Sequence, residues 1–161
     1  GLGPILFGST VSETIAFFGV PDKNKMDEFG DQELLYKEHN LTFSFSRDFN
    51  FYLTHIGTER ETLTLNGMKL FGKTESEIKR FIKMELIAKI SKEDGCIHED
   101  GHIQTWIAVN NLNISFWFHD DELYLIDILC DWNDDDTPRW PEGSTAWNER
   151  RKNLEKKQIQ M

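Results

Sequence analysis

The chain has 161 residues, of which 39% are hydrophobic, and its formal net charge is −10. This length fits one domain or two very small ones, and 12 Phe and 5 Trp suffice for a packed interior. The negative charge argues against a nucleic-acid binder, which usually presents a basic face, and no apolar run approaches the ~20 residues of a membrane span.

The chain also carries features that bear on its compartment. Its two cysteines, Cys96 and Cys130, are too few for a disulfide framework. No signal-peptide pattern opens the sequence. Reduced cysteines without a secretory segment predict a cytoplasmic protein.

Residues 7–13 predict the start of a first helix. They read Phe-Gly-Ser-Thr-Val-Ser-Glu, with Thr10 three residues before Glu13. This spacing indicates a capping box, in which each side chain accepts a backbone N–H from the other residue. Apolar residues follow at helical spacing, and Gly19 with Pro21 predicts the end of the helix.

Strand patterns follow this helix. Alternating apolar and polar residues predict strands at 34–37, 41–47 and 51–57, and a further strand is expected at 61–70. Asn40 stands between two of these runs, where it favours a tight hairpin turn. Short connections of this kind make the predicted sheet antiparallel.

The pattern then recurs. Residues 71–77 read Phe-Gly-Lys-Thr-Glu-Ser-Glu, so both stretches share Phe-Gly-x-Thr-x-Ser-Glu. A second capped helix is expected there, and further strands are expected at 102–109, 112–118 and 122–130. We therefore predict an α+β fold with two tandem helix-plus-antiparallel-hairpin repeats, whose antiparallel sheet has helices on one face.

The predicted organisation is one domain over residues 1–142, with repeats at about 5–66 and 68–130 and an acidic loop at 131–142. Residues 143–161 are expected to form a basic tail, helical or frayed. Residues 81–142 carry 14 acidic and 4 basic side chains, so the acidity is concentrated in the second repeat and its trailing loop. Such clusters either form a solvated surface or a rim that faces a cationic partner.

Two tryptophans stand out in the second repeat. Strand alternation places Trp106 and Trp117 on the sheet face opposite the helix. Large aromatic side chains on such a face are either covered by the C-terminal segment or used for binding.

Two metal-like patterns are judged weak. His98-Glu99-x-x-His102 matches the zinc-protease motif, which requires a helix, whereas Asp100-Gly101 inside it favours a hairpin turn. The oxygen ligands of residues 131–142 approach the spacing of a calcium loop, but Asp136 stands where that loop needs glycine. We expect no catalytic residues, no metal and no cofactor.

The repeated opening, together with Gly-Val-Pro-Asp at 19–22 and the Leu-x-Φ-Ser-Phe strands, in which Φ is an apolar residue, resembles a known group of proteins. It is similar to the tandem-repeat fold of β-lactamase inhibitor proteins and related outer-membrane assembly lipoproteins. It also resembles small acidic immunity proteins of bacterial polymorphic-toxin and contact-dependent inhibition systems. The resemblance covers about residues 5–130.

The resemblance implies an immunity protein, monomeric or a weak dimer, that binds and neutralises a cognate basic toxin domain such as a nuclease. Acidic residues would steer the partner and tryptophans would anchor it. The alternatives are a zinc-dependent hydrolase using His98, Glu99 and His102, and a non-catalytic module of a larger assembly. The expected partner-binding residues are Glu93, Asp94, Glu99, Asp100, Trp106, Trp117, Asp120, Asp121, Asp131, Trp132, Asp134, Asp135 and Asp136.

Overall fold

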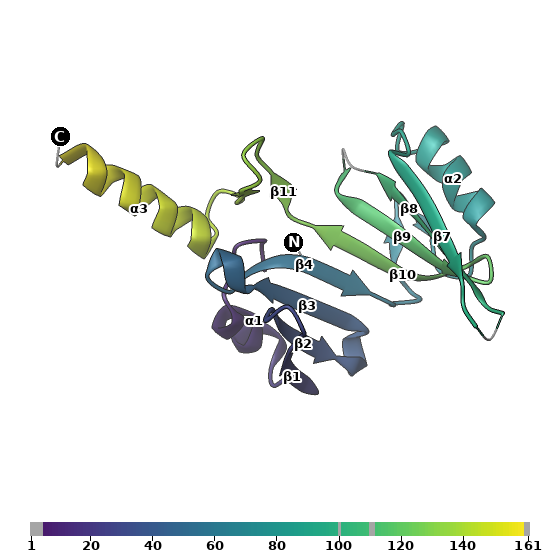
Figure 1. Ribbon diagram of the computed structural model, residues 1–161, viewed down its shortest axis with the longest axis horizontal. Coiled ribbons are helices and arrows are strands. Elements are labelled where there is room, and N and C mark those ends of the chain that lie inside the picture. The colour runs from purple at the N-terminus through teal and green to yellow at the C-terminus, as the bar shows by residue number, and fades with distance from the viewer. Residues whose placement is uncertain (1–4, 100, 110–111, 160–161) are drawn as a thin grey trace. The chain divides into compact units, whose positions relative to one another are not determined.

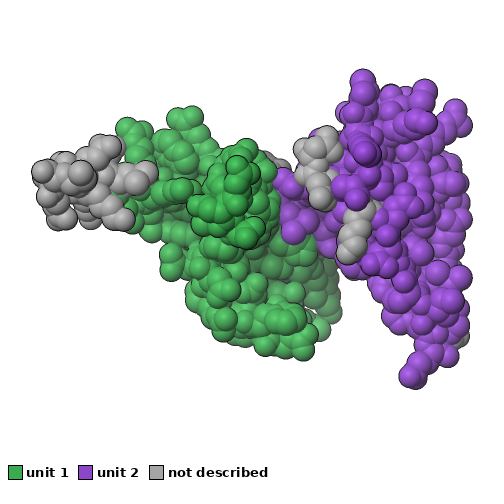
Figure 2. Space-filling model, turned by 45° about the horizontal axis from the view of Figure 1, so that its top comes forward, with its two compact units in different colours: residues 1–37, 42–56, 130–161 green, residues 38–41, 57–129 purple. Residues whose placement is uncertain are grey.

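The computed structural model describes residues 5–99, 101–109 and 112–159. The chain forms two compact units, which Figure 2 shows in different colours. Unit 1 comprises residues 1–37, 42–56 and 130–161, and unit 2 comprises residues 38–41 and 57–129. Helices and antiparallel strands build the chain, which confirms the predicted α+β class (Figure 1).

Unit 1 contains helix α1 (Val11–Phe18), which begins at the predicted capping box. The Thr10 hydroxyl accepts the Glu13 N–H at 3.2 Å, and the Glu13 carboxylate accepts the Thr10 N–H at 2.7 Å. The helix ends at Gly19, whose φ of 85° lies in the region that favours glycine.

Four strands of unit 1 lie side by side in chain order. They are β1 (Lys23–Met26), β2 (Gln32–Tyr36), β3 (Leu41–Ser46) and β4 (Tyr52–Thr58), with the short 3-10 turns η1 (Lys37–His39) and η2 (Arg47–Phe49) between the last three. Phe43 and Phe45 are fully buried, as alternation predicts. The Phe43 ring lies 5.1 Å from that of Phe18, so this face of the sheet packs against α1.

The C-terminal segment belongs to unit 1. The Cys130 N–H donates to the Thr54 carbonyl at 2.8 Å, where the chain enters this unit again. A small hairpin of β11 (Asp131–Trp132) and β12 (Pro138–Arg139) leads to helix α3 (Thr145–Ile159). The Ala146 N–H donates to the Gly8 carbonyl at 3.0 Å, which docks the first turn of α3 beside the entry to α1.

Unit 2 contains helix α2 (Glu75–Met84), whose capping box joins Thr74 and Glu77. Its strands are β5 (Thr64–Leu65), β6 (Met68–Lys69), β7 (Lys92–Ile97), β8 (Ile103–Val109), β9 (Ile114–His119) and β10 (Glu122–Leu129). The four long strands lie in the order β10-β9-β8-β7 and pair antiparallel. Ile78 and Ile82 of α2 are fully buried in one cluster with Phe116 of β9.

One sequence prediction about strands is wrong, and two strands were not predicted. Residues 61–70 do not form one strand, because Asn66 and Gly67 take positive φ and fold the segment into the hairpin of β5 and β6. Strands β1 and β7 were not expected. Each lies at the end of a strand order, where no second neighbour buries it, so its polar sequence shows no apolar alternation.

Substitution of Gly8 by alanine tests how closely the start of α3 packs against the segment that leads into α1. A Cβ at Gly8 would lie 2.8 Å from Ser144 Oγ and 3.0 Å from Ala146 Cβ, whereas at Gly72 the nearest atom lies at 3.9 Å. Both glycines have positive φ, so alanine at either costs about 1–2 kcal/mol of backbone strain. Gly8→Ala adds overpacking of about 1–3 kcal/mol. Urea unfolding should show the larger loss for Gly8→Ala, and equal losses would contradict the crowding.

A second prediction concerns pH. Burial and a 2.6 Å hydrogen bond to Glu149 raise the pKa of Tyr52 from 10.0 to about 12. Since the pKa is raised on folding, the stabilisation is complete below pH 10 and is lost as the pH rises through about 12. Phenolate absorbance, assigned with Tyr52→Phe, should show this late titration. Glu149→Gln should lower the pKa, whereas the exposed control Glu142→Gln should leave it unchanged.

Candidate functional site

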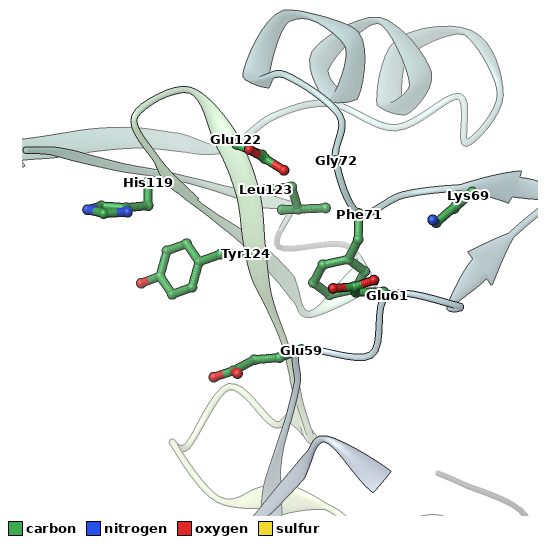
Figure 3. A pocket seen from close by; sticks show the side chains of 9 residues that line it. All are labelled: Glu59, Glu61, Lys69, Phe71, Gly72, His119, Glu122, Leu123 and Tyr124. Atoms are coloured by element: carbon green, nitrogen blue, oxygen red, sulfur yellow. The ribbon is translucent and has the colours of Figure 1, made fainter. Parts of the chain in front are cut away.

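A hollow of about 500 Å³ opens on unit 2 (Figure 3). Its wall carries three glutamates, one lysine, one histidine and aromatic rings. These side chains are Glu59, Glu61, Glu122, Lys69, His119, Phe71 and Tyr124. Three carboxylates against a single ammonium group give the hollow a negative potential, which a concave wall concentrates.

Two segments that are distant in sequence hold this wall together. Phe71 and Gly72 lead into α2, while Glu122 and Leu123 begin β10. The Leu123 N–H donates to the Lys73 carbonyl at 3.0 Å, and Thr74 forms a β-bridge with Glu122. The start of the helix therefore fixes the backbone that carries Glu122.

The turn between β9 and β10 brings the next group of side chains into place. Asp120 and Asp121 have φ of 49° and 69°, as a two-residue hairpin turn requires, and aspartate tolerates this region well. The Asp121 carboxylate accepts the Glu75 N–H at 3.0 Å, which ties the turn to the first residue of α2. Across the turn, His119 pairs with Glu122.

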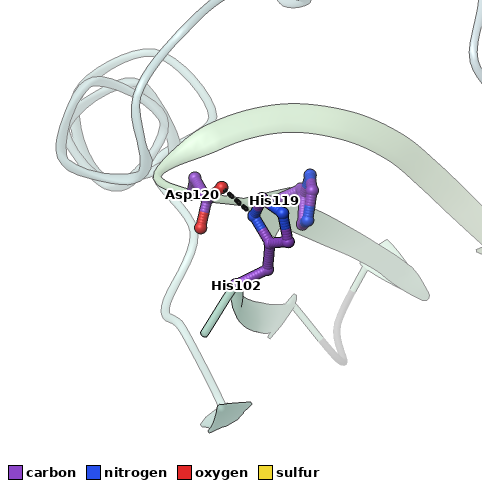
Figure 4. Close-up of side chains that lie close together, drawn as sticks. All are labelled: His102, His119 and Asp120. Atoms are coloured by element: carbon purple, nitrogen blue, oxygen red, sulfur yellow. Dashed lines mark hydrogen bonds and ion pairs between the residues drawn. The ribbon is translucent and has the colours of Figure 1, made fainter. Parts of the chain in front are cut away.

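A cluster of His102, His119 and Asp120 lies at this turn (Figure 4). The Asp120 carboxylate accepts the Ile103 N–H at 2.9 Å and contacts His102 Nδ1 at 2.6 Å. These two contacts hold the pKa of Asp120 below its usual value of 3.8. The His119 ring lies 4.7 Å from the His102 ring.

Trp106 and Trp117 form a stacked pair, with ring centroids 5.5 Å apart and planes inclined by 24°. They face each other in register across β8 and β9, on the sheet face opposite the one that Phe116 presents to α2. The Trp117 indole N–H donates to the Asp127 carboxylate at 2.7 Å, and Asp94 of β7 lies opposite Trp106 in register. The face predicted for these tryptophans is the one they occupy.

The predicted acidic residues of unit 2 have varied surroundings. Glu93 forms a 2.7 Å ion pair with Lys79, and the Asp94 carboxylate accepts the Gly95 N–H at 2.9 Å. Both belong to β7. Glu99 is exposed, and Asp100 lies outside the described residues. Several of these carboxylates therefore have structural partners, while their role in binding stays a prediction.

The remaining predicted residues belong to unit 1. Asp131 pairs with Arg139 at 2.9 Å, and Trp132 contacts the Phe49 ring at 5.4 Å. Thr137 donates to the Asp135 carboxylate and lowers the pKa of that group. Asp134 and Asp136 are exposed. The thirteen expected residues are thus divided between the two units.

Backbone hydrogen bonds join the two ends of the His-Glu-x-x-His stretch. The His98 N–H donates to the His102 carbonyl at 2.9 Å, and the Gly101 N–H donates back to the His98 carbonyl at 2.9 Å. The described residues of the motif, His98, Glu99, Gly101 and His102, lie in no helix, so the zinc-hydrolase alternative, which requires a helical motif, is unsupported. His102 instead lies beside His119 and Asp120.

Sequence reasoning missed the carboxylates of the hollow. Glu59 and Glu61 lie just after β4, in a stretch where a strand was expected from residue 61. Glu122 was expected only as the first residue of a strand. No local signal joins these residues, because the hollow depends on how the 59–61 segment, the entry to α2 and β10 come together.

Comparisons with known proteins are sparse. No model of a protein family matches the sequence, and no curated protein matches it. An extracellular protein containing an SCP domain from Bacillus anthracis is 11% identical, with a TM-score of 0.44 over 77% of this chain and 44% of that one. A cysteine-rich secretory protein from Staphylococcus aureus is 14% identical, with a TM-score of 0.46 over 89% of this chain and 54% of that one.

This chain spans about half the length of these two proteins. They are described as extracellular or secretory, and neither is an immunity protein. The expectations of a toxin-neutralising immunity protein, of its contact-dependent inhibition system and of a cytoplasmic location find no support in any of these comparisons, and we do not retain them. The shared Phe-Gly-x-Thr-x-Ser-Glu motif specifies only how a helix begins, so it does not identify a family. The number of cysteines likewise does not determine the compartment of the protein.

No helix in the described ranges combines the length and the apolar character that a membrane crossing needs.

Proposed function

We propose that this chain is a non-catalytic binding module whose unit 2 binds a cationic segment of a protein partner. The observation that carries the proposal is the hollow, where Glu59, Glu61 and Glu122 surround one space together with Lys69. A lysine or arginine side chain matches this wall in charge. The volume of about 500 Å³ also exceeds what one such side chain needs.

Aromatic groups support the same class of ligand. Tyr124 lines the hollow, and a tyrosine ring attracts a cation placed over its face. Arginine gains more than lysine from such a contact, because its planar guanidinium also stacks on aromatic rings. A partner segment rich in arginine therefore fits the hollow better than one rich in lysine.

The tryptophan pair extends this surface. Gln104 Nε2 donates to the Tyr124 hydroxyl at 2.6 Å, and Gln104 shares one face of β8 with Trp106. The hollow is thus linked through Gln104 to the Trp106–Trp117 pair. Stacked tryptophans supply apolar contact area at low entropic cost, and acidic groups nearby raise the rate of encounter with a cationic partner.

The charge of the chain also bears on its other partners. A net charge of −10 repels nucleic-acid phosphates and discourages self-association. We therefore propose a protein partner, no nucleic-acid partner, and a chain that is monomeric or weakly dimeric by itself.

The two units also support the proposal of a duplicated repeat. Each contains a capped helix followed by four antiparallel strands, α1 with β1–β4 and α2 with β7–β10. The N-cap threonine of each helix forms a β-bridge to the fourth strand, Thr10 to Tyr52 and Thr74 to Glu122. The neighbouring backbone hydrogen bonds also correspond, from Leu53 to Ser9 at 2.9 Å and from Leu123 to Lys73 at 3.0 Å.

Equivalent repeats predict equivalent caps. Thr10→Ala and Thr74→Ala each remove one capping box, so each should lower the free energy of unfolding of its unit by about 1 kcal/mol. Ser12→Ala, at an exposed position within α1, is the control that should cost nothing. Denaturant unfolding measures the losses, and costs that differ by more than about 1 kcal/mol would argue against equivalent roles.

The binding proposal is tested with a fluorescent arginine- and lysine-rich peptide and the full chain. Glu61→Gln with Glu122→Gln should weaken binding about thirtyfold, since each of the two lost charge contacts is worth on the order of 1 kcal/mol. The control pair, Glu28→Gln with Glu142→Gln, removes the same charge at exposed positions of unit 1. Fluorescence anisotropy measures the affinity.

Equal weakening by both pairs would mean that the peptide responds to net charge alone, which would overturn the hollow as the binding site. A glutamate-rich peptide that binds as well as the cationic one would contradict the charge argument. Trp117→Leu separates the two parts of the surface, because it should weaken a peptide that also carries aromatic residues more than a purely cationic one.

A further inference from the structure

Three side chains with metal-binding atoms meet at the end of the unit 2 sheet. His102, His119 and Asp120 each offer one ligand atom, and all three atoms lie within 4.8 Å of one another. They come from different places in the chain, since His102 precedes β8, His119 ends β9 and Asp120 begins the turn into β10. Figure 4 shows the Asp120 carboxylate beside the His102 ring, with the His119 ring next to it.

Backbone contacts hold these ligand atoms in place. The Asp120 N–H donates to the Ile103 carbonyl at 2.8 Å, and the Ile103 N–H donates to the Asp120 carboxylate at 2.9 Å. His119 and Gln104 are partners in the β8–β9 register. The hairpin before β8 is closed by the 2.9 Å hydrogen bond from the His98 N–H to the His102 carbonyl. The three ligands therefore stand on two hairpins that are tied to each other.

The donor set selects a class of ion. Two imidazole nitrogens and one carboxylate oxygen suit zinc and neighbouring first-row divalent ions, whereas calcium and magnesium prefer oxygen ligands alone. The side chains of His102 and Asp120 are 50% and 49% exposed, so water can complete the coordination sphere. We infer that His102, His119 and Asp120 form a binding site for one divalent transition-metal ion of the zinc class.

On binding, the metal takes the place of the contact between His102 and Asp120. The 2.6 Å separation between His102 Nδ1 and the Asp120 carboxylate shows that these two groups already lie within reach of one ion. The site uses His102 but neither His98 nor Glu99, so it differs from the His-Glu-x-x-His pattern. It also stands independently of the cationic partner proposed above, although His119 lines the hollow as well.

The test is a calorimetric titration of the full chain with zinc chloride, with folding checked by circular dichroism. One ion should bind per chain, and His102→Gln, His119→Gln and Asp120→Asn should each weaken binding at least about tenfold. The controls are His98→Gln and Cys96→Ser, because Cys96 Sγ lies 3.8 Å from His98 Nε2 and forms the competing arrangement on the same hairpin. Both controls should retain the wild-type affinity.

Nuclear magnetic resonance of the wild-type chain tests the site without relying on the folding of any variant. Zinc should shift the imidazole signals of His102 and His119 and leave that of His55, which contacts Ser44 in β3, unchanged. Absence of zinc binding to the wild-type chain would overturn the inference. Binding that is lost in His98→Gln or Cys96→Ser and kept in His119→Gln would overturn it as well.

Discussion

The two-residue turn between β9 and β10 is the constraint on which the surface of unit 2 depends. Its residues, Asp120 and Asp121, both adopt positive φ, and each carboxylate accepts a backbone N–H from another element. Asp120 holds the start of β8 through Ile103, and Asp121 holds the start of α2 through Glu75. This turn thereby fixes the positions of the start of β8, the start of α2 and the residues that flank the turn itself.

The placement of His119 and Glu122 follows from this turn. They pair directly across it, so His119 reaches both the hollow and the cluster with His102, while Glu122 carries one of the three carboxylates of the hollow. Inserting or deleting one residue in the turn would shift the pairing register of β9 and β10 by one residue, and the side chains of the shifted strand would then point to the opposite face of the sheet. The hollow and the cluster of His102, His119 and Asp120 therefore both depend on the geometry of this one turn.

Acidity by itself is a poor guide to function in this chain. Of the carboxylates expected to bind a partner, Glu93 pairs with Lys79, Asp121 caps α2 and Asp131 pairs with Arg139. Each of these groups has a partner within its own unit. The hollow differs because its glutamates come from separate segments of the chain and line one space together with Lys69.

The sequence by itself determined the local elements. The capping boxes at Thr10 and Thr74, the alternation that buries Phe43 and Phe116, and the turn at His98–His102 all depend on hydrogen bonds and periodicities within a few residues. The opposite-face placement of Trp106 and Trp117 follows from the same alternation. The shared Phe-Gly-x-Thr-x-Ser-Glu motif determined how the two helices begin. A helix start of this kind occurs in many proteins, so it does not specify a family.

Only the tertiary structure decided which side chains meet. His102 and Asp120 stand 18 positions apart in sequence, and the same hollow is lined by Glu59, from the segment after β4, and by Glu122, from the start of β10. Strands β1 and β7 are likewise held by a neighbour on one side and carry no apolar pattern of their own. Contacts of this kind depend on strand register and on the docking of α2, and these are set by packing over the whole unit rather than by any short stretch of residues.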